Sequence, residues 1–510
     1  MPVAVAVATS SELAADAART VIDRGGNAVD AALAAALMTM NTEPGVCALA
    51  GGAFITIKAP GQAPITIDGY AAVPGIGHSG SAAGWRSVDM DYGGGVTTIV
   101  GPASVAVPGT PAAVCEASRA YGVLPAAELL APTIDAVRQG FPLSQACHTY
   151  LQHSGRSVFE TDPAAFQALH PDGQTLLPVG GRVIIEGLAD TLQELADEGW
   201  ESFYSGAIAR EIVTYLGDNG ACMTAADLAR YAAHVRPALV VPLGDWQVAL
   251  NPPPAVGGSM LGAMLRAAAG GMPLLEAARA ALQYRRRRLD FSTRLAEDSA
   301  ALVDLASSPV SLARELGTTK PSAATVHTSA TDSDGLACAV TASAGSGAGA
   351  APPGTGLSLN NCLGELELNR HGLALAPPGT RLPSNMAPTV AWSPAHVLAI
   401  GSPGADRITT ALAQVLARRI LAGENLQSAI SAPRWHVDVA LTAETSLFTE
   451  TLCTEPGAIT EPPIGMAHRA FADQGMYFGG VGAVEMAVAD GTLTAVADAR
   501  RTGATVCPRR

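Results

Sequence analysis

A group of hydroxyl-bearing residues in the last third of the chain has the spacing needed for nucleophilic catalysis. Thr325, His327 and Ser329 alternate along one predicted strand, so they share one of its faces. Thr341 and Ser343 alternate in the same way along the predicted returning strand. A threonine hydroxyl is a weak nucleophile at neutral pH, and the free amine of an N-terminal threonine is one way to activate it. This chemistry requires that the chain be cut directly before Thr325.

The surroundings of these strands fit such a cut and such a reaction. Residues 291–324 are rich in Ser, Thr, Pro and Gly, which predicts an exposed linker. Farther along, Gly401–Ala405 precedes a predicted helix, and its turn can present backbone N–H groups that would stabilise an oxyanion. A threonine that merely begins a strand is the alternative, because Thr favours strands. The combination of linker, hydroxyls and turn favours catalysis.

Other chemistry-bearing motifs are weaker. Gly75–Gly80 has the spacing of a dinucleotide-binding turn, but no helix is predicted after it. Asp332–Gly335 begins like a calcium loop without the later ligands, so it predicts a hairpin turn. The sequence contains no G-x-x-x-x-G-K-[ST] and no H-E-x-x-H motif. We therefore expect neither a metal nor a cofactor.

The composition predicts a large globular protein. The chain has 510 residues, of which 48% are hydrophobic and 15% charged. Its net charge of −14 gives no electrostatic reason to bind nucleic acid or an anionic membrane. The basic run Arg285–Arg288 is expected to be a solvated helix face. The first residues lack the features of a secretory signal, and the apolar segment Ala31–Met40 is too short to cross a bilayer. We expect a soluble, cytoplasmic protein.

Predicted helices and strands alternate in the N-terminal third of the chain, whereas farther along they fall into separate helical and hairpin regions. Helices are expected at Ser11–Arg24 and Ala28–Met40, the second capped by Asn27, and strands at residues 51–57 and 65–67. The remaining expected elements are a mainly helical region at 110–290, hairpins at 325–343, 389–400 and 477–498, and a helix at 408–421. Segregated helices and hairpins favour α+β layers over a doubly wound parallel sheet.

The chain resembles the γ-glutamyltransferase family of self-cleaving N-terminal-nucleophile hydrolases along nearly its whole length. Thr325–His327 is similar to the T-T-H opening of the family's small subunit. Further segments match in the family's order: Gly25–Ala32, Glu43–Pro44, Gly51–Phe54, Val107–Thr110, Phe203–Gly206, Met223–Leu228, Pro252–Gly258, Gly356–Asn361, Met386–Thr389, Gly401–Gly404 and Ala432–Arg434. The resemblance implies a four-layer αββα sandwich made as one precursor, which is cut between Ala324 and Thr325.

The resemblance also implies two subunits. Residues 1–324 would form a large subunit that ends in the linker at about 291–324, and residues 325–510 would form a small subunit. The two would remain associated and act on a small-molecule substrate. Pairing of two processed molecules into a homodimer is left open, and no nucleic acid or membrane partner is expected.

Roles in catalysis follow from the same resemblance. Thr325 would be both the agent of self-cleavage and the nucleophile, with its freed amine as general base. Ser343 falls where the family keeps a second hydroxyl bonded to the nucleophile, and Thr341 lies nearby. Gly404 and Ala405 occupy the positions of the oxyanion-hole pair.

The substrate-binding positions depart from the family's pattern. Tyr70 stands where γ-glutamyl enzymes hold the substrate α-carboxylate with an Arg. Asn361 and Glu365 lie in the segment where the family keeps Asn, Gln and Asp, and Ser384 and Asn385 replace its paired serines. Losing a bidentate Arg–carboxylate contact costs a few kcal/mol of binding. The catalytic centre is thus kept, and the glutamyl clamp is not.

The sequence therefore predicts an amide hydrolase for a small substrate other than a γ-glutamyl peptide, with an acyl group transferred to Thr325 and then to water. Three alternatives remain open. One is a carbon–carbon hydrolase of the same family, acting next to a carbonyl in a secondary-metabolite pathway. Another is a γ-glutamyl hydrolase or transferase, in which Arg381 or Arg407 would replace the clamp. The third is an uncleaved, non-catalytic binding homologue. The Ala-rich, Lys-poor composition indicates a bacterial source with high GC content.

Overall fold

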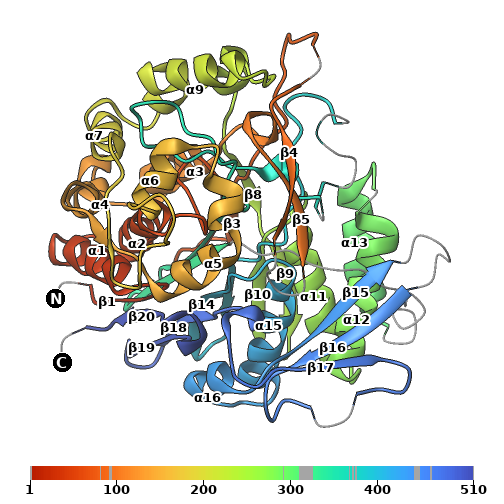
Figure 1. Cartoon of the computed structure of the whole chain (residues 1–510). Helices are drawn as coiled ribbons and strands as arrows, with labels where there is room; N and C mark the ends of the chain where they lie inside the picture. The colour runs from red at the N-terminus through yellow and green to blue at the C-terminus, as the bar shows by residue number, and fades with distance from the viewer. Residues whose placement is uncertain are drawn as a thin grey trace.

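Helices and strands form four layers (Figure 1): two sheets pack face to face, and helices cover both outer faces. The computed structural model describes residues 3–80, 82–90, 95–290, 292–308, 325–366, 368–369, 373, 376–441, 448–459 and 462–508. The α+β class and the αββα layering expected from the sequence are confirmed. None of the described helices is long and apolar enough to span a membrane.

The first sheet has seven strands and joins both ends of the chain. Their order is β20 (Ala504–Val506), β1 (Val5–Thr9), β11 (Val326–Asp332), β12 (Ala337–Ser343), β2 (Gly52–Lys58), β3 (Ile65–Gly69) and β8 (His234–Pro237). All neighbouring pairs are antiparallel. The predicted hairpin after Thr325 is confirmed as β11 and β12, and it lies at the centre of this sheet.

The second sheet has six antiparallel strands. Their order is β19 (Leu493–Ala497), β18 (Gly482–Ala487), β14 (His396–Gly401), β13 (Thr389–Trp392), β10 (Trp246–Leu250) and β9 (Leu239–Leu243). β11 and β12 face β14 of this sheet. A Cβ on Gly401 would lie 2.1 Å from the ring of His327, so the sheets can approach this closely only with glycine at that position.

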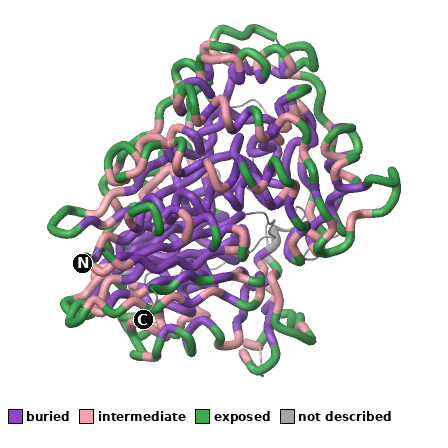
Figure 2. Tube along the Cα trace, turned by 90° about the vertical axis from the view of Figure 1, so that its left-hand side faces the viewer, coloured by how far each residue is buried: buried purple, intermediate pink, exposed green. Residues whose placement is uncertain are grey.

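The outer helices of the first sheet follow directly from the sequence. They are α1 (Glu12–Asp23), α2 (Ala28–Thr42), α3 (Thr110–Tyr121) and α4 (Ala126–Gln139). Asn27 caps α2 by accepting hydrogen bonds from the N–H groups of Val29 and Asp30, as predicted. Every residue of α2 is buried, because this almost wholly apolar helix packs between the sheet and its neighbours. Figure 2 shows buried segments concentrated in the interior of the molecule.

The outer helices of the second sheet include one that the sequence analysis did not expect. They are α11 (Val256–Ala269), α12 (Leu274–Tyr284), α13 (Leu295–Leu305) and α15 (Arg407–Leu416). α13 lies at the start of the stretch expected to be a linker, and its Leu302 and Val303 are buried. Residues 309–324, which include Ala324 of the expected cleavage site, lie outside the described residues.

Residues 110–290 are mainly helical, as predicted, but they also contain short strands. It contains α5 (Gln145–Phe159), α6 (Pro163–Leu169), α7 (Leu188–Glu198), α8 (Ser202–Ser205), α9 (Ala207–Asp218) and α10 (Ala225–Ala229). The remaining elements are α16 (Leu426–Ser431) and the strands β4 (Arg86–Met90), β5 (Val96–Val100), β6 (Phe141–Pro142), β7 (Arg182–Val183), β15 (Trp435–Leu441), β16 (Phe448–Thr454) and β17 (Ala467–Ala470). β8, β9 and β10 were missed: the short apolar runs of β9 and β10 fit a buried helix equally well, and β8 is a short, mostly exposed strand without an apolar pattern.

The basic run was expected to face solvent, and this is wrong for two of its four residues. The side chains of Arg285 and Arg286 are 0% and 1% exposed and both pair with Asp290. The run forms a π-helical turn, Arg285–Leu289, that continues α12. Only Arg287 and Arg288 are exposed.

Candidate active site

Thr325 and Ser343 lie side by side between the two sheets. The register of β11 and β12 pairs Val326 with Ala342 and His327 with Thr341. One further step along this register places Thr325 opposite Ser343, on the face turned to the second sheet. Both residues are buried, with 3% and 4% exposure. The alternation read from the sequence therefore corresponds to two neighbouring residues on adjacent strands.

One small pocket gathers most of the predicted site residues. Its described lining is Tyr70, Thr325, Ser343, Glu365, Leu368, Ser384, Asn385, Met386, Ala405 and Ile408, and the empty space between them, about 250 Å³, is partly open to solvent. The lining comes from segments on both sides of residue 325. Of the predicted substrate-binding residues, only Asn361 lies outside it. Leu368, Met386 and Ile408 were not predicted as site residues, and they supply the apolar part of the wall.

The turn after β14 brings Ala405 of the predicted oxyanion pair to this pocket, whereas Gly404 is not among the described residues that line it. Gly404 has φ of 126° and Ala405 has φ of 53°. Both values are positive, and positive φ is disfavoured for a residue with a Cβ, such as Ala405. Within the described part of the chain, the N–H groups of Gly404 and Ala405 have no acceptor. Ala405 lines the pocket, and the N-terminus of α15 follows two residues later. An oxyanion is the kind of ligand that such a turn binds.

Thr341 is engaged away from the pocket. Its Oγ1 lies 2.8 Å from Nδ1 of His327, and Nε2 of the same ring lies 2.7 Å from Oγ of Ser329. Burial lowers the pKa of His327 to about 3, so the ring is neutral at physiological pH. The structure thus places Thr341 two cross-strand pairs away from Thr325, in a hydrogen-bonded row that stabilises the sheet interface.

Asn361 supports loops instead of lining the pocket. Its Oδ1 accepts a hydrogen bond of 2.7 Å from the N–H of Ser346. Its Nδ2 donates to Oγ1 of Thr98 and to the carbonyl of Ile99, both at 3.0 Å. These bonds occupy both ends of the amide, so the side chain ties the segment after β12 to β5.

Tyr70 and Glu365 form the polar end of the pocket. Tyr70 stacks on Phe54 with ring centres 5.5 Å apart, and its hydroxyl donates a hydrogen bond of 3.5 Å to Oε2 of Glu365. Burial raises the pKa of Tyr70 well above its ordinary value, so the phenol stays neutral. No Lys, Arg or His is among the described residues that line this pocket.

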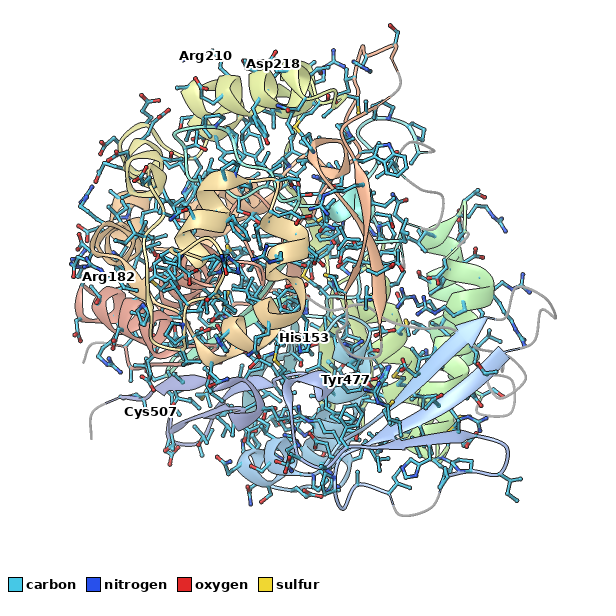
Figure 3. The ribbon with its side chains drawn as sticks, viewed as in Figure 1. His153, Arg182, Arg210, Asp218, Tyr477 and Cys507 are labelled. Carbon is cyan, nitrogen blue, oxygen red and sulfur yellow. The ribbon has the colours of Figure 1, made fainter. Side chains whose placement is uncertain are left out.

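Neither arginine considered as a substitute clamp lines the described pocket. Arg381 donates a hydrogen bond of 2.9 Å to the carbonyl of Tyr70 and stacks 4.0 Å from the ring centre of Tyr231. Arg407 donates to the carbonyl of Tyr477 at 3.2 Å and lies 4.6 Å from the centre of that ring. Figure 3 labels Tyr477, which lies beside α15.

Arg501 contacts the nucleophile candidate directly, and the sequence analysis missed it. Its Nη1 donates a hydrogen bond of 3.1 Å to the carbonyl oxygen of Thr325. The residue is 6% exposed and lies in the short turn before β20, which neighbours β1. No local pattern indicates this contact, because 176 positions separate the two residues.

Glu43 is a buried carboxyl near this arrangement. Ser10 Oγ donates a hydrogen bond of 3.1 Å to its Oε1. Burial raises the pKa of Glu43 to about 7, although Ser10 and the positive charge of Arg501 act in the opposite direction. The side chain therefore holds a proton in the folded protein over a range in which an unfolded glutamate is ionised.

We expect Glu43→Gln to remove a pH dependence of stability. Between about pH 4.5 and pH 7 the folded state binds more protons than the unfolded chain, so wild-type stability falls as pH rises. The amide does not titrate, so the variant gains on the order of 3 kcal/mol relative to wild type by about pH 8. Melting temperatures at about pH 5 and about pH 8 measure this gain. Glu198→Gln, at an exposed position, is the control and should show none. An equal effect of Glu43→Gln at both pH values would contradict the assignment.

The side chains that could bind a metal do not form a metal centre among the described residues. Among the residues that the structure describes, no group of three His, Cys, Asp or Glu side chains is arranged to hold a metal ion. The chemistry of the pocket is instead that of hydroxyls, an amide, one carboxyl and backbone N–H groups.

The chain is similar to known proteins along nearly all of its length. A family model described as Gamma-glutamyltranspeptidase matches residues 14–507. An acylase ACY 1 proenzyme of Pseudomonas sp. (strain SE83) is 27% identical, over 98% of this chain and 93% of the relative. A glutathione hydrolase proenzyme of Pseudomonas sp. (strain A14) is 29% identical, over 84% of this chain and 81% of the relative.

A solved structure shares the fold. The cephalosporin acylase of Bacillus halodurans has a TM-score of 0.80, over 100% of this chain and 96% of that chain, at 22% sequence identity. At this identity the likeness shows the fold alone. The overall fold described above is therefore shared with this solved structure.

Proposed function

The chain belongs to the gamma-glutamyltranspeptidase family, and on that premise we propose that it cuts itself before Thr325 and then hydrolyses an amide bond. As a member of this family it is an enzyme, a hydrolase or transferase of the N-terminal-nucleophile type. Residues 1–324 and 325–510 are the two proposed subunits. Each sheet contains strands from both segments, with β1 between β20 and β11 in the first sheet and β10 beside β13 in the second, which supports their staying together after the cut.

The observation that carries the proposal is the shared pocket of Thr325, Ser343 and Ala405. In the proposed reaction, the Thr325 hydroxyl attacks the substrate carbonyl while its freed amine accepts the hydroxyl proton. The N–H groups of Gly404 and Ala405 stabilise the oxyanion. The same amine returns the proton to the departing nitrogen, and water then releases the acyl group. Ser343 supports the nucleophile from the neighbouring strand.

The proposed substrate is a small amide whose acyl group is not γ-glutamyl. Tyr70 and Glu365 place a phenol and a carboxyl in the pocket, and no described cation lines it. An α-carboxylate would therefore enter without a described cationic partner and beside the carboxyl of Glu365. The acylase relative, which covers more of this chain than the glutathione hydrolase does, supports the same choice.

The test is a panel of p-nitroanilides carrying acetyl, butyryl, γ-aminobutyryl, glutaryl and γ-glutamyl groups. We expect γ-glutamyl anilide to be no better a substrate than γ-aminobutyryl anilide, which differs only by lacking the α-carboxylate. A retained Arg clamp would instead favour the γ-glutamyl compound by roughly 10- to 100-fold in kcat/KM. Glutathione should likewise be hydrolysed poorly by fully cleaved protein. Efficient turnover of either γ-glutamyl compound would contradict the proposed substrate class.

A further inference from the structure

Two buried arginines outside the pocket contact one residue of its lining and one residue next to that lining. Arg285 and Arg286 follow α12 and have side chains that are 0% and 1% exposed. Nη1 of Arg285 donates a hydrogen bond of 2.5 Å to Oδ1 of Asn385, which lines the pocket. Nη2 of Arg286 lies 3.4 Å from Oδ2 of Asp406, the residue that follows Ala405 in the oxyanion turn.

The two arginines form one rigid unit with Asp290. Nε of Arg285 donates to Oδ1 of this carboxylate at 2.8 Å, and Nη1 of Arg286 donates to Oδ2 at 2.7 Å. Burial alone would raise the pKa of Asp290, but the two guanidinium charges hold it below its ordinary value. One carboxylate thus anchors two guanidinium groups, one of which also reaches Asn385 in the pocket lining, and the other Asp406 next to that lining.

The π-helical turn explains how two consecutive arginines reach the same carboxylate. The N–H of Asp290 donates to the carbonyl of Arg285 at 2.9 Å, five residues back, which is the wider spacing of a π-helix. The next two residues, Arg287 and Arg288, are exposed. The segment therefore contains two inward and two outward arginines, which provides matched controls.

We propose that Arg285 and Arg286 are positioning residues of the active site, Arg285 acting through Asn385 and Arg286 through Asp406. The proposal rests on the proposed function, in which Thr325 is the nucleophile of this pocket. It also gives the large segment a specific role, because both arginines precede residue 325 and both acceptors follow it. After the cut, these contacts would cross from one subunit to the other.

The two arginines should act on different kinetic constants. The bond to Arg285 turns Oδ1 of Asn385 toward the guanidinium and so fixes the amide in the substrate wall. The contact with Arg286 fixes Asp406 from one side, and Arg407 Nη1 holds it at 3.3 Å from another. Asp406 directly follows Ala405 in the chain, so holding Asp406 in place also holds the Ala405 N–H in place. The position of this N–H matters only when the oxyanion forms. Loss of Arg285 should therefore weaken binding, whereas loss of Arg286 should slow the chemical step.

The experiment compares four single variants on the best-cleaved anilide of the panel. Arg285→Met should raise KM about tenfold with little change in kcat, because one charge-assisted hydrogen bond to the substrate wall is lost. Arg286→Met should lower kcat roughly 10- to 100-fold at nearly constant KM, because the donor is misplaced. Arg287→Met and Arg288→Met, at the exposed positions, should leave both constants unchanged.

A second route tests the Arg286 contact from its other end. Asp406→Asn should lower kcat as Arg286→Met does, and the double variant should lose little more than either single variant. If Arg286→Met fails to fold, as judged by circular dichroism, Asp406→Asn decides on the role of Arg286. Unchanged kcat in Asp406→Asn, or parallel changes of kcat and KM in both arginine variants, would overturn the proposal.

The outcome separates this proposal from the proposed function. A wild-type chain that stays uncut, or a Thr325→Ala variant that remains active, would overturn the proposed function whatever the arginine variants do. A cut, active wild type whose arginine variants show no separation of kcat from KM would overturn the positioning roles alone.

Discussion

Thr325→Ala is expected to give a single full-length chain that folds but neither cuts itself nor hydrolyses any anilide of the panel. The hydroxyl needed for attack is gone, and without the cut no amine is freed to act as general base. The wild-type chain should instead run on a denaturing gel as two pieces of about two thirds and one third of its length, residues 1–324 and 325–510. Intact-mass measurement would locate the cut to the residue.

Thr325→Ser is the matched variant, because it keeps the hydroxyl and removes only a methyl group. We expect it to be cut, more slowly than wild type, and to retain part of the activity. Circular dichroism of the Ala variant should match that of wild type, since Thr325 directly precedes β11 and the substitution removes only a hydroxyl and a methyl group. Cleavage of the Ala variant at the same bond would show that another protease, and not Thr325, makes the cut.

The centre of the fold was predictable because its signals are local. The hairpin of β11 and β12 alternates with period two around the turn Asp332–Gly335, where Oδ1 of Asp332 accepts from the N–H groups of Asp334 and Leu336. The register of this hairpin then places Thr325 opposite Ser343 without any long-range information. Helix α2 was predictable for a similar reason, because its cap and its apolar length are both contiguous in sequence.

The edges of the sheets were harder to predict. β9 and β10 form the end of the second sheet, but their apolar runs carry no period that separates a strand from a buried helix. β1 is a short run of Val and Ala at the start of the chain, and only its partners β11 and β20 make it a strand. In these elements tertiary pairing decides the structure, and the sequence pattern does not reveal the partner.

The candidate site also has features that the local sequence predicts and features that it does not. Gly404 could be expected at a turn with positive φ, but nothing in the sequence shows that Ala405 adopts φ of 53°. Asn361 and Glu365 lie in one short segment, yet only Glu365 lines the pocket. Arg285 and Arg286 pair with acceptors 100 and 120 positions away. Such contacts depend on how the layers pack, which local spacing does not encode.

Replacing the backbone amide of Ala405 with an ester is expected to lower kcat about 100- to 1000-fold, or about 3–4 kcal/mol. Lactic acid introduced at this position by nonsense suppression removes one N–H and leaves the methyl group and the chain direction unchanged. Proline also removes the N–H, but its ring fixes φ near −65°, far from the 53° that Ala405 adopts. A loss of activity in Ala405→Pro would therefore mix a missing donor with a distorted turn. Ala405→Gly should remain active, because it keeps the N–H and adopts positive φ readily.

The control ester belongs at Ala63, in the exposed turn between β2 and β3, where the same replacement should leave kcat unchanged. KM of the Ala405 ester should change much less than kcat, because the donor is needed mainly when negative charge develops on the carbonyl oxygen. A folded Ala405 ester that hydrolyses the anilide at nearly the wild-type rate would contradict the oxyanion role. The positive φ of Ala405 would then serve only to lead the chain from β14 into α15, and the catalytic donors would have to be sought elsewhere around Thr325.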